Sequence, residues 1–315
     1  WIKEVVIMNK KGLMFAFFTA LVSGFSIFIN KFGLKGFDPF VFTGLKAVVV
    51  ALFLLSMIFF IGEFRELTKL TKKQWLKLSA IGLFGGSIPF LLFFKGLSIT
   101  SAASGAFIHK TMFIFVTIGA IIFLREKVNK YFIAGAGLLL IGNALLLNIS
   151  SSFASAVLTK GNLFILIATL LWATENIISK HVLKELSSRI VAFGRMAFGF
   201  GFILLFWIIT GRMETAFSTT LPQLTWILLT SAFLFLYVAS WYYALQRLKA
   251  SVATSILLLG SPITTLLSII FLNSSVTIYQ GFGMLLVIAG VVMAVGIVYI
   301  KNLVKYFVPV PNSHK

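Results

Sequence analysis

The sequence predicts an all-α membrane protein with ten transmembrane helices, arranged as two inverted five-helix repeats. Composition is the first observation: 59% of the 315 residues are hydrophobic and only 11% are charged, with a mean hydropathy of +1.04. A soluble domain has roughly a quarter of its residues charged. The other two observations are ten apolar segments of membrane-spanning length and a similarity between the two halves of the chain.

The ten apolar segments set the predicted organisation, because a spanning helix needs about 20 mostly apolar residues. They cover residues 12–31, 39–62, 77–97, 99–124, 130–148, 161–183, 190–210, 223–245, 251–272 and 278–300. We therefore expect a first repeat over 1–148, an outer linker over 149–160, a second repeat over 161–300 and a tail over 301–315.

The net charge of +19 comes from short basic clusters between the apolar segments. The clusters form no single basic face, which argues against nucleic-acid binding. If the helices alternate in direction, 19 of the 27 Lys and Arg residues lie on the side of the N-terminus, 5 lie on the other side and 3 lie within spans. Cytoplasmic loops of membrane proteins are enriched in Lys and Arg. The chain is thus expected in a prokaryotic plasma membrane with both termini cytoplasmic.

The two halves match at an offset of 148–149 residues. The matching pairs include Lys31 and Lys180, Lys46 and Arg195, Tyr131 and Tyr279, Gly135 and Gly283, and Gly142 and Gly290. Because each half holds five spans, an odd number, the second half enters the membrane from the opposite side. Inverted repeats are typical of secondary transporters, whose halves exchange conformations around a midplane site. The alternative is a duplication retained only for folding.

Several motifs of this sequence resemble the drug/metabolite transporter superfamily, EamA type, over essentially the whole chain. They are Gly24–Lys31 in the first span, Trp172-Ala173 with Lys180 in the sixth, Phe123-Leu124-Arg125-Glu126 at the end of the fourth, Ser240–Ala250, and Pro262 in the ninth. The sequence departs from the family pattern at Ser23, Ile114 and Ser274, where Trp, Pro and Glu would be usual.

The resemblance implies a central cavity lined by spans one, three, four, six, eight and nine. It also implies a proline bend in the ninth span, whereas Ile114 puts the matching bend of the fourth span in question. Members of the family move amino acids and other metabolites, often outward, and related branches carry sugar phosphates or nucleotide sugars. An exporter of an amino acid or related carboxylate is therefore expected, with a sugar-phosphate or nucleotide-sugar transporter as the alternative.

Lys110 and His109 are the first candidates for substrate binding, because charges at membrane depth are costly and indicate function. Lys110 lies about 18 Å along its helix from Ser98 and about 22 Å from Arg125, at 1.5 Å per residue. This pair predicts a cationic site for a carboxylate or phosphate, with His109 as a titrating group. A structural ion pair at Lys110 is the alternative.

Glu175 is the one acid that the sequence places well inside a span. A lone buried carboxylate needs a partner, and Lys110 and Arg195 are the candidates. Glu175 is expected to bind a substrate ammonium group or a coupling proton, with Asn176 as a weaker polar neighbour. The alternative is a static salt bridge.

The remaining candidates have weaker signals. Trp172, Trp241 and Tyr242 are candidates for stacking on a substrate, and Asn30 of the first-span motif completes the predicted binding set. Lys46 and Arg195 lie at matching positions about 10 Å inside their spans, which favours a structural or gating role. Pro89 and Pro262 are predicted hinges.

Other classes of function find little support in the sequence. There is no cysteine, no His-Glu-x-x-His motif and no Walker-type lysine loop, so an intramembrane enzyme and a channel are the lower alternatives. We expect no cofactor and no metal, with proton coupling as an option. The expected partners are a small solute and the lipid bilayer, and the chain is expected to be a monomer or homodimer.

Overall fold

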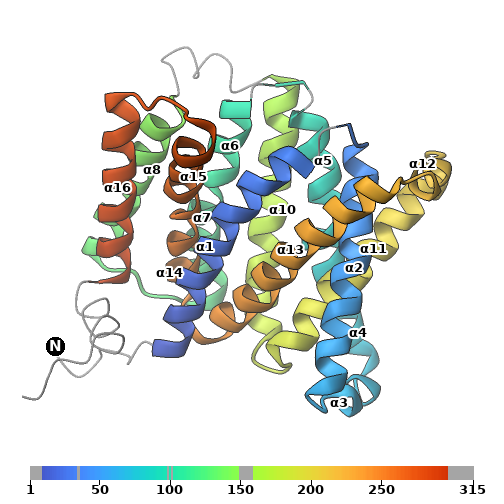
Figure 1. Cartoon of the computed structure of the whole chain (residues 1–315). Coiled ribbons are helices and arrows are strands. Elements are labelled where there is room, and N and C mark those ends of the chain that lie inside the picture. The colour runs from blue at the N-terminus through green and yellow to red at the C-terminus, as the bar shows by residue number, and fades with distance from the viewer. Residues whose placement is uncertain (1–8, 34–35, 98, 101, 149–158, 297–315) are drawn as a thin grey trace, which may run out of the picture.

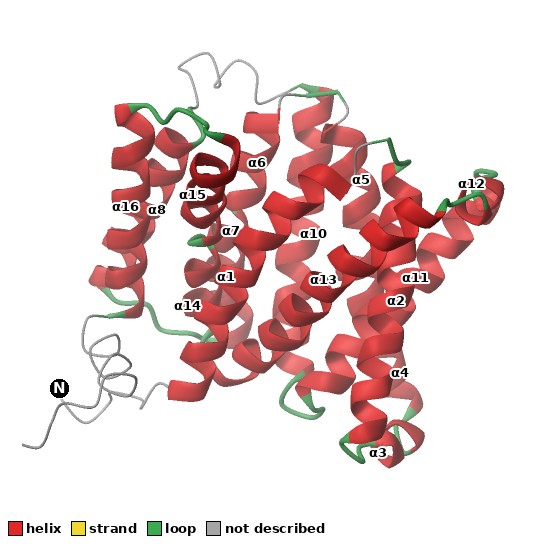
Figure 2. Cartoon of the chain, viewed as in Figure 1, coloured by secondary structure: helices red, strands yellow, loops and turns green. Residues whose placement is uncertain are grey.

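The computed structural model describes residues 9–33, 36–97, 99–100, 102–148 and 159–296. Every regular element in this part of the chain is helical (Figure 2). Nine of these helical segments are long and apolar enough to cross a membrane. The predicted all-helical membrane class is therefore confirmed, and the predicted tail 301–315 lies outside the described residues, as does most of the linker.

The helices follow the order of the predicted spans. They are α1 (Lys10–Gly33), α2 (Pro39–Phe60), α3 (Phe64–Thr68), α4 (Lys72–Ile81), the π-helical turn η1 (Gly82–Ser87), α5 (Ile88–Leu97), α6 (Ala102–Lys110), α7 (Met112–Leu124), α8 (Lys130–Leu146), α10 (Lys160–Val182), α11 (Ser188–Ile209), α12 (Met213–Phe217), α13 (Leu221–Arg247), α14 (Ala250–Leu257), α15 (Gly260–Leu272) and α16 (Ile278–Val295).

The predicted fifth span, 130–148, forms the short apolar helix α8. Its 17 residues fall below the length of the nine longer segments among the described residues. The helix begins where the Asn129 side chain accepts a hydrogen bond from the Phe132 N–H group at 2.8 Å. Asn129 is thus an N-cap, so α8 begins at Lys130, where the predicted span begins, and it ends at Leu146, two residues before the predicted end.

The helices run alternately up and down a single bundle (Figure 1). We call the end at which α1 begins and α10 ends the basic face, and the other end the opposite face. On the basic face Lys77 bonds both carboxylate oxygens of Glu185, at 2.7 and 2.8 Å, and Glu63 pairs with Arg189. The hydrogen bonds from Lys77 hold the pKa of Glu185 below its usual value. Ion pairs therefore join the α2–α4 region to the α10–α11 connection and to the start of α11 at this face.

Three of the spans are interrupted at mid-depth. The third contains η1, the fourth changes from α6 to α7 at Thr111, and the ninth changes from α14 to α15 at Leu258 and Leu259. Pro262 explains the last break, because proline has no N–H for the Leu258 carbonyl; the Ser261 N–H group donates to that carbonyl at 3.1 Å instead.

The fourth span breaks although Ile114 stands where a proline would be usual. The Thr111 hydroxyl donates to the Ile108 carbonyl at 2.6 Å, and the Thr111 N–H group is shared between the carbonyls of Phe107 and Ile108. Hydrogen bonds from Thr side chains to the preceding turn bend helices. The absence of proline therefore did not imply a continuous helix.

Two helices, α8 and α16, pack at one end of the bundle through glycines. A Cβ atom on Gly135 would lie 2.7 Å from the Gly290 carbonyl oxygen, and one on Gly142 would lie 2.8 Å from that of Gly283. The reverse contacts, from Gly290 and Gly283, are 2.8 and 2.7 Å. Small residues let membrane helices approach closely, so these four glycines set the separation of the two helices.

Candidate functional site

The Gly85 carbonyl in the π-helical turn is the point where three spans meet. Pro89, four residues later, has no N–H group to donate to it. The carbonyl instead accepts hydrogen bonds from Trp172 Nε1 at 3.0 Å and Arg195 Nη2 at 3.1 Å. Pro89 thereby frees an acceptor, and the predicted hinge lies directly beside the helix irregularity.

Glu175 is fully buried and hydrogen-bonded, and we call it with its neighbours Ser179, Tyr242 and Arg195 the acidic cluster. Its Oε1 atom accepts from Ser179 Oγ and from the Tyr242 hydroxyl, both at 2.5 Å. A Cβ atom on Gly85 would lie 2.4 Å from Glu175 Cγ and 3.1 Å from Arg195 Nε. Both charged side chains therefore lie against the same glycine, without a direct salt bridge between them among the described residues.

A second polar group lies toward the opposite face, and we call Ser26, Asn30 and Lys46 the lysine cluster. Lys46 Nζ donates to Asn30 Oδ1 at 2.7 Å and lies 4.9 Å from the centre of the Phe42 ring. Asn30 Nδ2 in turn donates to Ser26 Oγ at 3.0 Å. The lysine ammonium is thus held by an amide oxygen and by an aromatic face, which attracts cations.

His109 and Lys110 lie at the mid-depth break of the fourth span. The His109 ring contacts Trp172 and Phe93, with ring centres 4.9 and 5.5 Å apart. Lys110, the last residue of α6, is half-buried, and its ammonium forms no hydrogen bond or ion pair with any described residue. A cation at this depth without a protein partner is available to an anionic ligand.

The structure brings together some of the predicted residues and separates others. Trp172 lies between His109 and the acidic cluster. Its ring contacts His109, and its Nε1 group shares the Gly85 carbonyl with Arg195. Trp241 is buried in the hydrophobic core. The Asn176 Nδ2 group bonds the Trp172 carbonyl at 2.8 Å, while its Oδ1 atom has no partner in the described part of the chain.

Three residues that contribute to these polar clusters were not among the predicted site residues: Ser179, Ser26 and Gly85. Ser179 and Ser26 each lie one helical turn from the residue that they bond, so a search for polar pairs four residues apart would have found them. Gly85 carries no such signal, because its role depends on a carbonyl and on two other helices.

Glu126, which follows α7, joins two spans at the basic face. Its carboxylate accepts from the Ala250 N–H at 2.6 Å and from the Ser251 hydroxyl at 2.6 Å and N–H at 3.2 Å. Acidic groups stabilise helix N-termini, so Glu126 caps α14. Nearby, Lys180 Nζ donates to the carbonyls of Leu245 at 2.6 Å and Leu248 at 2.5 Å, as expected for a charge at a helix end.

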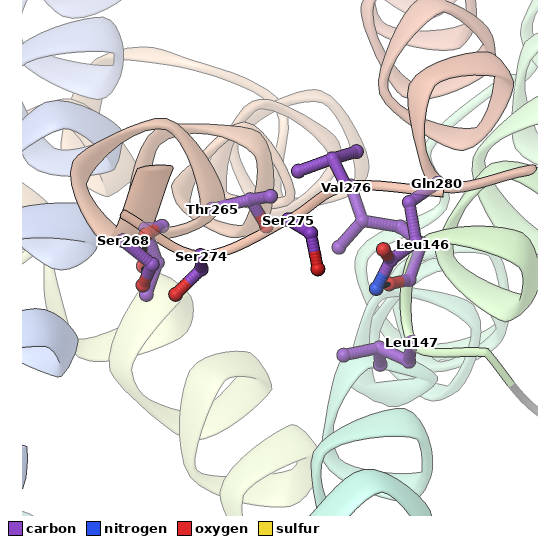
Figure 3. A pocket seen from close by; sticks show the side chains of 9 residues that line it. Leu146, Leu147, Thr265, Ser268, Ser274, Ser275, Val276 and Gln280 are labelled. Carbon is purple, nitrogen blue, oxygen red and sulfur yellow. Dashed lines mark hydrogen bonds between the residues drawn. The ribbon is translucent and has the colours of Figure 1, made fainter. Parts of the chain in front are cut away.

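The opposite face has a cavity of ≈ 290 Å³ beside the connection from α15 to α16. Figure 3 shows Thr265, Ser268, Ser274 and Ser275 along this cavity, with Gln280 on its other side. Ser274 stands in the second half where Glu126 stands in the first. Among the described residues, a carboxylate therefore caps a helix at the basic face, whereas hydroxyl side chains line part of a cavity at the opposite face.

Comparison with known proteins gives consistent matches. The model of the EamA-like transporter family matches this chain twice, over residues 10–148 and 159–296. An uncharacterized transporter of Archaeoglobus fulgidus is 25% identical over 90% of this chain and 97% of its own length. The uncharacterized transporter YoaV of Bacillus subtilis is 27% identical over 87% of this chain and 92% of its own length.

One solved crystal structure has the same fold. It aligns with a TM-score of 0.75 over 90% of this chain and 96% of that chain, at 14% identity. The predicted resemblance is confirmed by the family matches across both halves. The chain belongs to the EamA-like transporter family and is an integral membrane transporter of the drug/metabolite transporter superfamily.

Proposed function

We propose that this transporter carries an amino acid or related carboxylate by alternating access, as an exporter, between two inverted halves of five spans each. The observation that carries the proposal is Lys110. Within the described residues it is the deep cation without a partner, whereas Arg195 and Lys46 are held by Gly85 and Asn30.

The proposed architecture has ten spans, and the shorter helix α8 is the fifth in chain order. Its 17 residues are at the lower limit of about 17–25 for a spanning helix. Reciprocal glycine contacts support an inverted repeat, because Gly135 and Gly142 correspond to Gly283 and Gly290 at an offset of 148. Gly135 contacts Gly290 while Gly142 contacts Gly283, which is the exchange of partners expected about a pseudo-two-fold axis.

In alternating access, the region where the fourth and ninth spans end would open to one side of the membrane at a time. Glu126 holds α14 at the basic face, which we assign to the cytoplasm from its excess of Lys and Arg. The cavity lined by Ser274 lies at the opposite face. The described state is therefore interpreted as closed toward the cytoplasm, and release of the Glu126 cap is the step that opens it.

A carboxylate suits the Lys110 site better than a phosphate does. One unpaired ammonium at mid-depth matches a single negative charge, whereas phosphate is typically held by several donors or by bidentate Arg. A sugar phosphate remains the second candidate because its chemistry also needs a cation. A thermal-shift screen of purified protein against amino acids, organic acids and phosphorylated metabolites separates the two classes.

The test of the proposal is transport of the best screened ligand by the variants Lys110→Ala and Lys110→Arg in proteoliposomes. Lys110→Ala is expected to lower flux by about 100-fold, since a buried charge pair with the ligand is lost, while Lys110→Arg retains part of it. Lys46→Gln is the matched control, because Lys46 already has a protein partner. Near-normal flux through Lys110→Ala removes this residue from the site.

Proton coupling is proposed at Glu175. Its carboxylate is buried between two hydroxyl donors, so a proton on Glu175 would change both hydrogen bonds and the contact with the neighbouring Arg195. Glu175→Gln is expected to abolish the pH dependence of transport. Unchanged pH dependence in this variant would show that the coupling proton binds elsewhere.

A further inference from the structure

A second cavity lies on the outside of the bundle between α7 and α10. It encloses ≈ 420 Å³ and is lined almost entirely by apolar side chains. Several of these side chains are exposed: Ile122 is 62% exposed, Ile118 48% and Leu170 40%. Exposed apolar surface at this depth of a membrane transporter faces lipid, so the cavity is a groove open to acyl chains.

Both walls of the groove end in basic residues. On α10 the groove residues Leu170, Thr174 and Ile177 are spaced four and three residues apart, and His181 continues this stripe one turn later. Lys184 follows in the turn that ends the helix, where its N–H bonds the His181 carbonyl. Both basic side chains are exposed.

The α7 wall has the same arrangement. Ile118 and Ile122 line the groove, and Arg125 follows three residues beyond Ile122, directly after the last residue of α7. Arg125 is exposed and ends α7 in a left-handed conformation, with φ of 55°. Since α7 and α10 both run toward the basic face (Figure 1), Arg125, His181 and Lys184 lie at the same end of the groove.

The acidic side chains nearby are engaged elsewhere. Glu185 bonds Lys77 with both oxygens, and Glu126 caps α14. The seam between α1 and α15 provides a contrast, because a Cβ atom on Gly24 would lie 2.4 Å from Ile263 Cγ2 and the Thr264 hydroxyl bonds the Gly24 carbonyl. Side chains therefore fill the contact between α1 and α15, whereas those between α7 and α10 leave a groove.

We propose that the groove between α7 and α10 binds one anionic phospholipid, with an acyl chain against Ile118, Ile122 and Thr174 and the phosphate against Arg125, His181 and Lys184. The long apolar walls ending in cations match a lipid rather than a soluble anion. The lipid would lie along the face of α10 opposite to Glu175 and beside the half-helix that follows Lys110. This site goes beyond the proposed transport function and does not depend on it.

Native mass spectrometry of the full chain with dioleoyl phosphatidylglycerol or dioleoyl phosphatidylcholine tests the site. We expect one retained phosphatidylglycerol, preferred over phosphatidylcholine by about tenfold or more for two cations near a phosphate. The double variant Arg125→Gln/Lys184→Gln should lose most of this preference. The control Lys72→Gln/Lys73→Gln, also at the basic face, should keep it. A preference that survives the first variant overturns the headgroup assignment.

The acyl-chain part of the site has its own test. Thr174→Trp fills the groove from an exposed position and is expected to lower retention of both lipids at least fivefold, by excluding the chain. Ile121→Trp is the control, because Ile121 lies on α7 beside groove residues and is 43% exposed but does not line the groove. Equal retention in the two variants would mean that lipid binds only to the basic surface. Size-exclusion profiles verify that each variant is folded.

Discussion

The acidic cluster and the lysine cluster have corresponding positions but opposite chemistry. Ser26, Asn30 and Lys46 match Glu175, Ser179 and Arg195 at one offset of 149 residues. In the first half a neutral amide holds a lysine. In the second half a carboxylate takes two hydroxyl hydrogen bonds beside an arginine that bonds a backbone carbonyl.

The difference shows how one packing scheme can support two electrostatic environments. In both clusters a polar pair four residues apart on one helix lies beside a cation from the next helix. The acid appears only in the cluster nearer the basic face, where it offsets the charge of Arg195. The lysine cluster retains a net positive charge, moderated by the Phe42 ring. The two clusters should therefore respond differently to matched substitutions.

The largest expected difference is between Arg195→Met and Lys46→Met. Arg195→Met leaves the buried Glu175 carboxylate without its neighbouring cation and should destabilise the protein by about 3–5 kcal/mol. Lys46→Met removes a single hydrogen-bonded cation and should cost about 1 kcal/mol. Denaturant unfolding in one detergent measures both. Equal losses would contradict the distinction between the clusters.

Next in size is the effect of Gly85→Ala, which introduces a methyl group between Glu175 and Arg195. Its Cβ atom would lie 2.4 Å from Glu175 Cγ, and such overpacking should cost about 2–3 kcal/mol. Gly201→Ala is the control, since a Cβ atom there meets nothing within 4 Å. If the two glycines tolerate alanine equally in a thermal unfolding assay, the close approach at Gly85 is not a constraint.

A smaller difference is expected between Tyr242→Phe and Ser26→Ala. Tyr242→Phe removes one of two donors to a buried carboxylate and should cost about 1.5 kcal/mol. Ser26→Ala should cost less than about 0.5 kcal/mol, because Asn30 Nδ2 also bonds the Ser26 carbonyl at 2.7 Å. A double-mutant cycle of Tyr242→Phe with Glu175→Gln should show coupling; additive losses would mean that the hydroxyl acts independently of the acid.

Substitution of Glu185, whose carboxylate is exposed, is expected to have the smallest effect on stability. It serves as a reference for the buried carboxylate of Glu175. Lys77 lowers its pKa, so its stabilising contribution is present above the unfolded-state pKa and is lost as pH falls through the folded-state pKa. Glu185→Gln should lower Tm at pH 7 by less than about 2 °C, as for exposed ion pairs. The difference from the unsubstituted protein should disappear as pH falls below the folded-state pKa of Glu185. A larger effect that persists in acid would indicate a different role for this residue.

Much of the fold could be predicted from local sequence, because lipid leaves few alternatives for an apolar segment. Helices satisfy their backbone groups internally, so segment length and composition predicted ten spans; among the described residues nine are long apolar helices, and the segment 130–148 forms the shorter α8. The break at Thr111 was not predicted, since threonine permits either a straight or a bent helix and the outcome depends on the hydrogen bond to Ile108.

The site was only partly predictable for a related reason. Charge at depth singled out Lys110, Glu175, Arg195 and Lys46, which are costly in lipid wherever they occur. Their partners depend on helix packing, so the sequence left both Lys110 and Arg195 as partners for Glu175. The structure places Arg195 beside Glu175 and leaves Lys110 apart from it.

The sequence by itself determined the membrane class, the helix boundaries to within a few residues and the family, because each follows from composition or from motifs along one segment. Only the tertiary structure decided which charges are held and which remain available. The Gly85 carbonyl, released by Pro89 and shared by Trp172 and Arg195, exists as a site because three spans meet there. The physical reason is that hydrogen bonds and desolvation act through space, between helices that no local pattern connects.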